Sequence, residues 1–154
     1  MKKIVFAFIL IICSSVAVIG QDTQQPRYLS ICKQAENVYN AEGAEKAVKF
    51  LTDNQNYFDE NNALEVFIWY YLSATYAQFG NLYKQSLPLL EKCVAMIDNE
   101  GTSFYTRNNA QFLRVYYWRG VAQFYNGYDK SIATKSFEKA KLVYETAMLQ
   151  DTEV

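Results

Sequence analysis

Apolar side chains recur at helical spacing through most of the chain. From residue 62 to 80 the spacing predicts one helix, whose apolar face carries Leu64, Phe67, Ile68, Tyr71, Leu72 and Thr75. Asn62 is suited to cap its start, because an asparagine side chain accepts hydrogen bonds from free backbone N–H groups. Gly80 is expected to supply a turn. A second helix is predicted after it, with Pro88 near its start and a stripe of Leu87, Leu90, Val94 and Ile97.

The same pattern occurs again 47 residues later. The segment NNALEVFIWYYLS begins at Asn61 and NNAQFLRVYYWRG begins at Asn108. The match extends through Gly80 and Gly127, and through the Glu-Lys pairs that begin at Glu91 and Glu138. Self-similarity at a fixed period is typical of stacked supersecondary units. We therefore predict a second helix hairpin from 109 to 144, with a last helix from about Asp129 to Leu149.

A shorter and less similar pair of helices is predicted ahead of these two. Its first helix has an apolar stripe of Tyr28, Ile31, Ala35 and Val38, and its second has Ala47, Val48 and Leu51. Gly43 separates them as a helix breaker. No stretch alternates with the period of a strand. The expected fold is all-α, with about six helices arranged as three antiparallel hairpins in one domain, residues 27–149, and a short tail at 150–154.

Small and large residues occupy matching places in the two similar units. The third unit has Tyr116 and Gly120 on its first helix, a turn at Gly127, and a second helix with Ala133, Phe137 and Ala140. The corresponding positions of the preceding unit are Trp69, Ser73, Gly80, Ser86, Leu90 and Cys93. Small residues let two helices approach closely, and large ones fill the gaps between hairpins.

This pattern resembles the tetratricopeptide repeat (TPR) family. The resemblance covers roughly residues 60–144, with 35–51 as a weaker first copy, and it implies a short TPR-like α-solenoid. The period departs from the family, which repeats every ~34 residues, whereas HEAT and armadillo repeats have periods of ~40–47. Those repeats remain the competing architecture. The small and aromatic residues match the tetratricopeptide pattern better, so we interpret the chain as a divergent member.

The first twenty residues have the features of a secretory signal peptide. Lys2 and Lys3 precede an apolar run from Ile4 to Ile12, and polar residues follow Gly20, after which we expect cleavage. A cut after Ala17, an uncleaved anchor, and a lipoprotein attached through Cys13 are the weaker alternatives. Residues 21–26 form a polar segment before the domain. The expected location is periplasmic or secreted in a bacterium, with no stable membrane insertion after cleavage.

Composition excludes several classes of function. The chain without its first twenty residues has 13 basic and 16 acidic residues, a formal charge of −3 with no basic block, so no nucleic-acid partner is expected. Cys32 and Cys93 both fall on predicted apolar stripes. They either pair in an oxidising compartment or, as we favour, remain buried hydrophobic residues.

The chemistry of catalysis is largely missing from the chain. It contains no histidine, which removes the commonest general base and metal ligand. It has no phosphate-binding glycine loop and no C-x-x-C pair. The acidic pair Asp59-Glu60 precedes a predicted helix start, where negative charge is favoured by the helix dipole. We therefore expect no enzymatic activity, no metal and no cofactor.

Aromatic residues are the most distinctive feature, with 13 tyrosines and 10 phenylalanines. Consecutive aromatics on a helix differ by about 100° around its axis, so some of them must lie outside the core of their own hairpin. They face either the next hairpin or a binding groove. By the tetratricopeptide resemblance, the first helices of the hairpins line such a groove with Phe67, Tyr70, Gln78, Arg114, Tyr117, Phe124 and Tyr125.

These features favour a non-catalytic protein–protein interaction module of the cell envelope, an adaptor or assembly factor that binds a peptide or protein segment. The alternative is a small-ligand or glycan-binding protein that uses the aromatic cluster. The last helix also has more apolar surface than one side needs, at Leu142, Val143, Tyr144 and Met148. Self-association through this C-terminal helix is therefore also expected.

Overall fold

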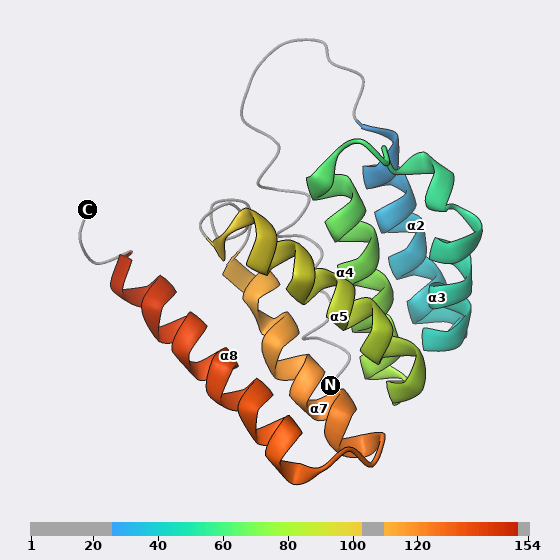
Figure 1. Cartoon of the computed structure of the whole chain (residues 1–154). Helices are drawn as coiled ribbons and strands as arrows, with labels where there is room; N and C mark the ends of the chain where they lie inside the picture. Colours follow the sequence, from blue (N-terminus) through green and yellow to red (C-terminus); the bar gives the residue numbers. More distant parts are fainter. Residues whose placement is uncertain (1–25, 103–109, 151–154) are drawn as a thin grey trace.

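The computed structural model describes residues 26–102 and 110–150, and side chains only as far as Thr146 in the last helix. The expected signal peptide with Cys13, residues 151–154 of the tail and the Met148 side chain lie outside this part. Within it the chain is all-helical, as predicted, with no strand. The six α-helices are α2 (Arg27–Glu42), α3 (Ala44–Asp53), α4 (Ala63–Phe79), α5 (Tyr83–Glu100), α7 (Val115–Tyr125) and α8 (Lys130–Gln150). Two short 3₁₀-helices, η1 (Gln55–Tyr57) and η2 (Ala110–Arg114), precede α4 and α7 (Figure 1).

The 47-residue echo is confirmed as a structural repeat. Ala63 and Tyr83 open α4 and α5, and the residues 47 positions later, Ala110 and Lys130, open η2 and α8. The first pair of helices matches its prediction as well. Its expected apolar residues are buried, apart from Val38 and Val48, which are half-buried. The spacing of apolar residues thus located all six helices.

The two similar units begin differently. Asn62 caps α4, because its side-chain oxygen accepts from the N–H groups of Leu64 at 3.1 Å and Glu65 at 3.3 Å. The Glu65 carboxylate in turn accepts from the Asp59 N–H at 2.9 Å. In the third unit Phe112 stands at the position equivalent to Glu65, and it is buried rather than capping. In the described part of this unit, α7 is preceded by the 3₁₀-helix η2, in which Phe112 packs into the core.

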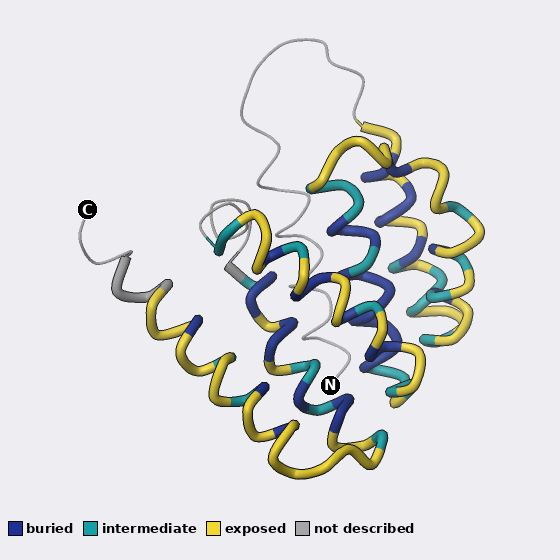
Figure 2. The backbone as a smooth tube through the Cα atoms, viewed as in Figure 1, coloured by how far each residue is buried: buried dark blue, intermediate teal, exposed yellow. Residues whose placement is uncertain are grey.

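Each helix packs most extensively against its neighbours in the chain, so the three hairpins form one continuous hydrophobic core. Helix α4 lies at the centre, in contact with α2, α3, α5 and α7. It is the most deeply buried element (Figure 2). Among residues 26–102 and 110–150, none of the helices has the length and apolar character needed to cross a bilayer.

Glycines at equivalent positions of the two similar units have different roles. Gly127 has φ +77°, the left-handed conformation expected of a glycine turn. Gly80 also lies in the turn that was expected there, but its φ is −87° and the left-handed residue of this turn is Asn81 at φ 58°. Gly80 is required for space instead. A Cβ atom there would collide with the Cβ of Ala44 at the start of α3.

Pro88 lies deeper in its helix than expected. Helix α5 begins at Tyr83, so Pro88 falls in the second turn rather than at the start. A proline at this place leaves the carbonyl four residues earlier, on Lys84, without its usual N–H partner. Both residues are exposed, so water can hydrate that carbonyl and the helix continues.

The two cysteines behave as small core residues. Cys32 on α2 and Cys93 on α5 are both buried and are not joined by a disulfide. Burial raises the pKa of the Cys93 thiol well above its usual range, which keeps the group protonated and unreactive. The interpretation as buried hydrophobic residues is therefore the one that the structure supports.

The small residue expected between the two helices of the third hairpin is tightly packed. A Cβ atom on Gly120 would lie 2.7 Å from the Phe137 ring, which is shorter than any real carbon contact. Gly120→Ala should therefore lower the free energy of unfolding by about 1–2 kcal/mol, because the clash outweighs the helical preference of alanine. In a Phe137→Ala background the same change should raise it by up to ~1 kcal/mol. Urea unfolding of the four proteins measures both values.

A shift of the same sign and size in both backgrounds would contradict this packing. In that case helix propensity alone would determine the effect of Gly120, and the Phe137 ring would not limit the approach of α7 to α8.

Candidate functional site

The expected groove residues separate into a buried set on α4 and an exposed set on α7. Phe67 and Gln78 were expected to contact a partner, and this is wrong. Phe67 is fully buried, with its ring 4.9 Å from Phe112 and 6.0 Å from Tyr71. The side-chain amide of Gln78 donates to the Trp118 carbonyl at 2.9 Å. The third hairpin therefore already occupies the surface that these two residues were expected to offer.

Helix α4 is buried because its sequence is apolar on every side. Every residue from Phe67 to Gln78 is buried except Tyr70, which is half-buried. A helix that is apolar all round must be covered all round. Tyr70 lies edge-on to Trp69, with 4.9 Å between the rings, and the Trp69 indole N–H donates to the Leu51 carbonyl of α3 at 2.9 Å. This leaves Tyr70 only partly accessible.

The predicted residues of the third unit are exposed. Arg114 ends η2, and Tyr117, Phe124 and Tyr125 follow on α7. Tyr117 and Phe124 are separated by two helical turns and therefore share one side of the helix. Each of these two is 50% exposed and Tyr125 is 62% exposed, which is far from the usual state of a large aromatic side chain. We call Tyr117, Phe124 and Tyr125 the α7 stripe.

The rings of the α7 stripe are held by contacts with three helices. Tyr117 lies 5.6 Å from Phe137 of α8 and 5.3 Å from Trp118. Tyr125 stacks on Tyr83 of α5, with 4.5 Å between the rings and only 9° between their planes. Ring contacts of this kind fix the orientation of side chains that are otherwise exposed. Tyr117 and Tyr125 of the stripe thus have defined ring contacts with the neighbouring helices α8 and α5.

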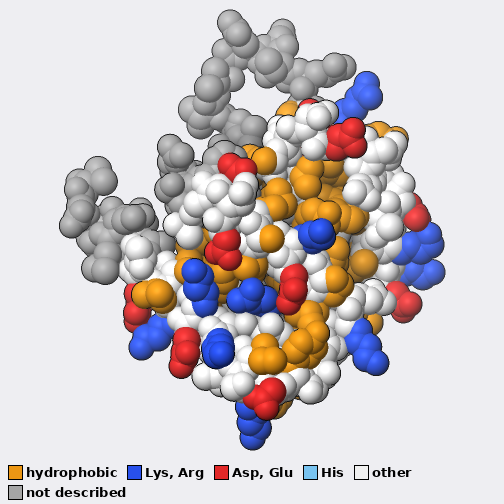
Figure 3. Space-filling view, viewed as in Figure 1, with side chains coloured by type: hydrophobic (Ala, Val, Ile, Leu, Met, Phe, Trp, Pro, Cys, Tyr) orange, Lys and Arg blue, Asp and Glu red, His pale blue; other side chains and the backbone are white. Residues whose placement is uncertain are grey.

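Exposed apolar side chains concentrate on the third hairpin. Eight large hydrophobic residues are exposed in the described part of the chain, and only Tyr57 lies outside 117–144. The others are Tyr117, Phe124, Tyr125, Tyr128, Ile132, Leu142 and Tyr144. Figure 3 shows one face of the molecule, where hydrophobic patches are interspersed with charged side chains. Such a concentration is typical of a surface that contacts another molecule.

Polar contacts fix the third hairpin on the second. The Tyr116 hydroxyl donates to Asp98 on α5 at 2.8 Å, and Lys139 on α8 lies 3.9 Å from the same carboxylate oxygen. In the turn after α7, the Asn126 amide donates to the Tyr83 carbonyl at 2.9 Å. These contacts hold α7 in place, so the position of the α7 stripe follows from the packing beneath it.

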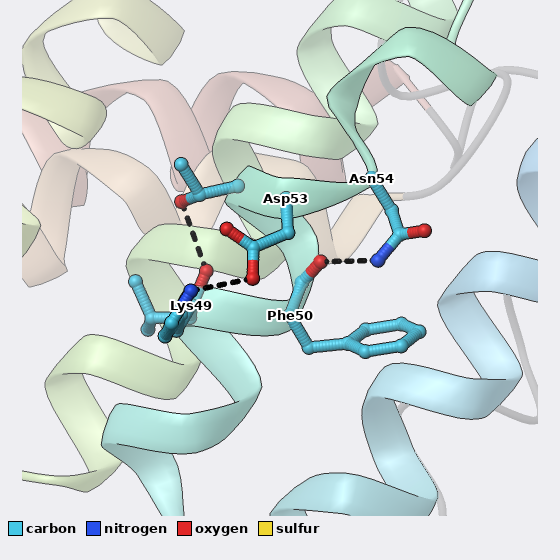
Figure 4. Close-up of polar contacts among 6 residues, drawn as sticks. Lys49, Phe50, Asp53 and Asn54 are labelled. Atoms are coloured by element: carbon cyan, nitrogen blue, oxygen red, sulfur yellow. Dashed lines mark hydrogen bonds and ion pairs between the residues drawn. The ribbon is translucent and has the colours of Figure 1, made fainter.

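A polar hollow lies at the other end of the molecule, between the end of α3 and the start of α4. Its lining includes the acidic residues Asp53, Asp59 and Glu60. Two of these groups have structural partners: Asp59 accepts from the Asn61 N–H at 2.9 Å, and Asp53 pairs with Lys49 at 2.6 Å (Figure 4). The Asn54 amide donates to the Phe50 carbonyl at 2.8 Å and so satisfies the helix end. In the described ranges no group of three or more acidic or cysteine side chains is arranged to hold a metal ion.

The buried tyrosines hold their protons. Burial raises the pKa of Tyr71, Tyr76 and Tyr116 well above the usual range, and for Tyr116 the hydrogen bond to Asp98 adds to the effect. A tyrosine with such a pKa does not serve as a base near neutral pH.

Comparison with family models, curated proteins and solved structures found no match to this chain.

Two buried tyrosine hydroxyls, one with a hydrogen-bond partner and one without, allow a matched test of these hydrogen-bond assignments. Tyr76 packs against Tyr39, with 5.0 Å between the rings, and its buried hydroxyl has no hydrogen-bond partner within the described residues. Tyr76→Phe should therefore leave the free energy of unfolding unchanged or raise it by up to ~1 kcal/mol. Tyr116→Phe should lower it by about 1–2 kcal/mol, because Asp98 loses its donor.

Urea unfolding with circular dichroism measures both values. Equal losses in the two variants would contradict the assignment, because the Tyr76 hydroxyl would then have a partner of its own.

Proposed function

We propose that this protein is a non-catalytic interaction module, a divergent TPR-like α-solenoid that binds a protein segment on the α7 stripe. The single observation that carries the proposal is the contrast between equivalent surfaces of the two similar units. At the equivalent positions of α4, Gln78 is buried against α7, Ala77 is buried and Tyr70 is half-buried, whereas Tyr117, Phe124 and Tyr125 are half exposed or more. An ordered apolar surface with this composition is typical of a binding hot spot.

The tetratricopeptide arrangement is supported by packing rather than by period. Gly120 lets α7 approach Phe137 of α8 closely within a hairpin, which fits the small position of that pattern. Each hairpin packs on the next in chain order. The site differs from the expected groove, because it lies on one helix and not between two.

The cell envelope is the proposed location. It follows from the features of residues 1–20, which resemble a signal peptide, and a bacterial adaptor or assembly factor fits that place. In this proposal the protein meets its partner outside the cytoplasm and uses no cofactor and no reaction chemistry.

A glycan or small-ligand site is the second candidate, and one observation favours it. Tyr83, Lys84, Tyr125 and Asn126 line a hollow at the start of α5. Aromatic and amide side chains are suited to sugars, but here Tyr83 and Tyr125 already stack on each other. A glycan array that gives a specific signal, lost on Tyr125→Ala, would favour this candidate over the interaction module.

Alanine replacements in the α7 stripe test the proposal. Immobilised wild-type protein should capture a partner from an envelope extract, and Tyr117→Ala and Phe124→Ala should each weaken that capture by about 1–3 kcal/mol, or 5- to 150-fold. Tyr57→Ala is the matched control, because Tyr57 is 44% exposed on η1, in another hairpin. Quantitative mass spectrometry compares the four proteins after circular dichroism confirms that each is folded.

Capture that is equal for all four proteins would refute the assignment of the stripe. Loss of capture in Tyr57→Ala alone would place the binding surface on the first hairpin instead.

A further inference from the structure

Formal charge is distributed unequally over the three hairpins. Residues 27–53, which form α2 and α3, contain four basic and four acidic residues. Residues 54–102, which include α4 and α5, contain two basic and six acidic residues, a charge of −4. Residues 110–150, with α7 and α8, contain six basic and three acidic residues, a charge of +3. The hairpin with the exposed aromatic residues is therefore also the basic one.

The opposite charges of the second and third hairpins are in contact where these two hairpins pack together. Lys139 of α8 lies 3.9 Å from Asp98 of α5, and the ammonium group is also 5.7 Å from the centre of the Tyr116 ring. An acidic hairpin is thus covered by a basic one. The aromatic residues of the basic hairpin supply the apolar part of the same interface, since Phe112 packs on Phe67 and Trp118 on Phe79.

The repeat shows what kind of element covers such a surface. Tyr117 and Phe124 lie 47 residues after Tyr70 and Ala77. Ala77 is fully buried and Tyr70 is half-buried, and the next residue, Gln78, which is equivalent to Tyr125, is buried and donates to the Trp118 carbonyl of α7. The same side of α7 carries no such cover in the described structure. By equivalence, a helix with large apolar side chains fits there.

We propose that the α7 stripe receives an amphipathic helix of another protein, with apolar residues on one face and acidic residues beside them. The proposal rests on the function inferred above and adds the chemistry of the partner. Lys130 and Lys141 of α8 are exposed, and Arg114 is exposed at the end of η2. Acidic side chains beside the apolar face of a docked helix complement these charges.

A second copy of this chain fits the surface less well. Pairing two third hairpins through the same face would bring two charges of +3 together. Head-to-tail stacking would instead place the stripe on the outer side of α2, where the exposed residues are polar or small, such as Arg27, Lys33, Gln34 and Asn40. That face offers no large apolar side chain to the aromatic rings.

Two synthetic peptides test the proposal. Both have leucine and phenylalanine at positions i, i+3, i+4 and i+7 of a helix, and they differ only in glutamate or lysine at the remaining positions. Fluorescence anisotropy measures their binding to the protein without its first twenty residues. We expect the glutamate peptide to bind on the order of tenfold more tightly, with a preference that declines as the salt concentration rises.

Two double variants and one single variant separate charge from apolar contact. Lys130→Glu/Lys141→Glu should abolish the preference for the glutamate peptide. Lys33→Glu/Lys46→Glu makes the same change of net charge on exposed residues of the first hairpin and should retain the preference. Tyr117→Ala should weaken both peptides.

The outcomes distinguish an acidic helical partner from another kind of partner and from a second copy of this chain. Equal binding of the two peptides, or tighter binding of the lysine peptide, overturns the acidic partner, and loss of both on Tyr117→Ala would still support the interaction module. Failure of both peptides to bind the wild-type protein overturns the helical partner, while capture from the extract remains the separate test of the module. A dimer in sedimentation experiments that Tyr117→Ala abolishes would identify a second copy as the occupant and also overturn the proposal.

Discussion

The burial of α4 on all sides is the constraint on which the rest of the structure depends. Eleven of its seventeen residues are buried, including Trp69, Tyr71 and Tyr76, and one helix hairpin cannot cover so much apolar surface. Helices α2 and α3 cover one part of it, α5 another, and η2 with α7 the remainder. The first and third hairpins are therefore held in position by a helix that belongs to neither.

The same constraint explains why equivalent residues of the repeat have different roles. Gln78 is buried against Trp118 of the third hairpin, whereas its equivalent, Tyr125, is 62% exposed. A repeat unit buries the face that its neighbour covers, and the third unit keeps an open face in the described part of the chain. Position in the array therefore contributes to which residues are core and which are surface.

The formal charge also differs between consecutive hairpins. The second hairpin is acidic and the third is basic, and their contact includes the Asp98–Lys139 pair. This pair is about half exposed, so its contribution to stability is small. The pair matters because it joins hairpins of opposite charge. The face that binds the second hairpin and the face proposed for a partner both belong to the basic third hairpin. Apolar contact would supply most of the affinity for that partner, and charge would select among partners.

The expected groove residues differ in accessibility between α7 and α4. Arg114, Tyr117, Phe124 and Tyr125 are accessible, as expected, and Phe67 and Gln78 are not. The family pattern places all of these on one type of surface. It does not include the approach of η2 and α7 to α4, which fills that surface in the second unit. The apolar character of α4 on every side was the available signal that its groove face would be covered.

The sequence by itself determined the all-helical class, the approximate positions of the helices and the 47-residue repeat, because helical periodicity, caps and breakers act over a few residues. It also indicated that a small residue at Gly120 would let the two helices of the third hairpin approach closely. Only the tertiary structure decided that Asn81 and not Gly80 adopts the left-handed conformation, and that Gly80 is there to admit Ala44. It also decided which aromatic residues are exposed, because the burial of a side chain depends on neighbours that are distant in the sequence and on whether a next hairpin is present to cover it.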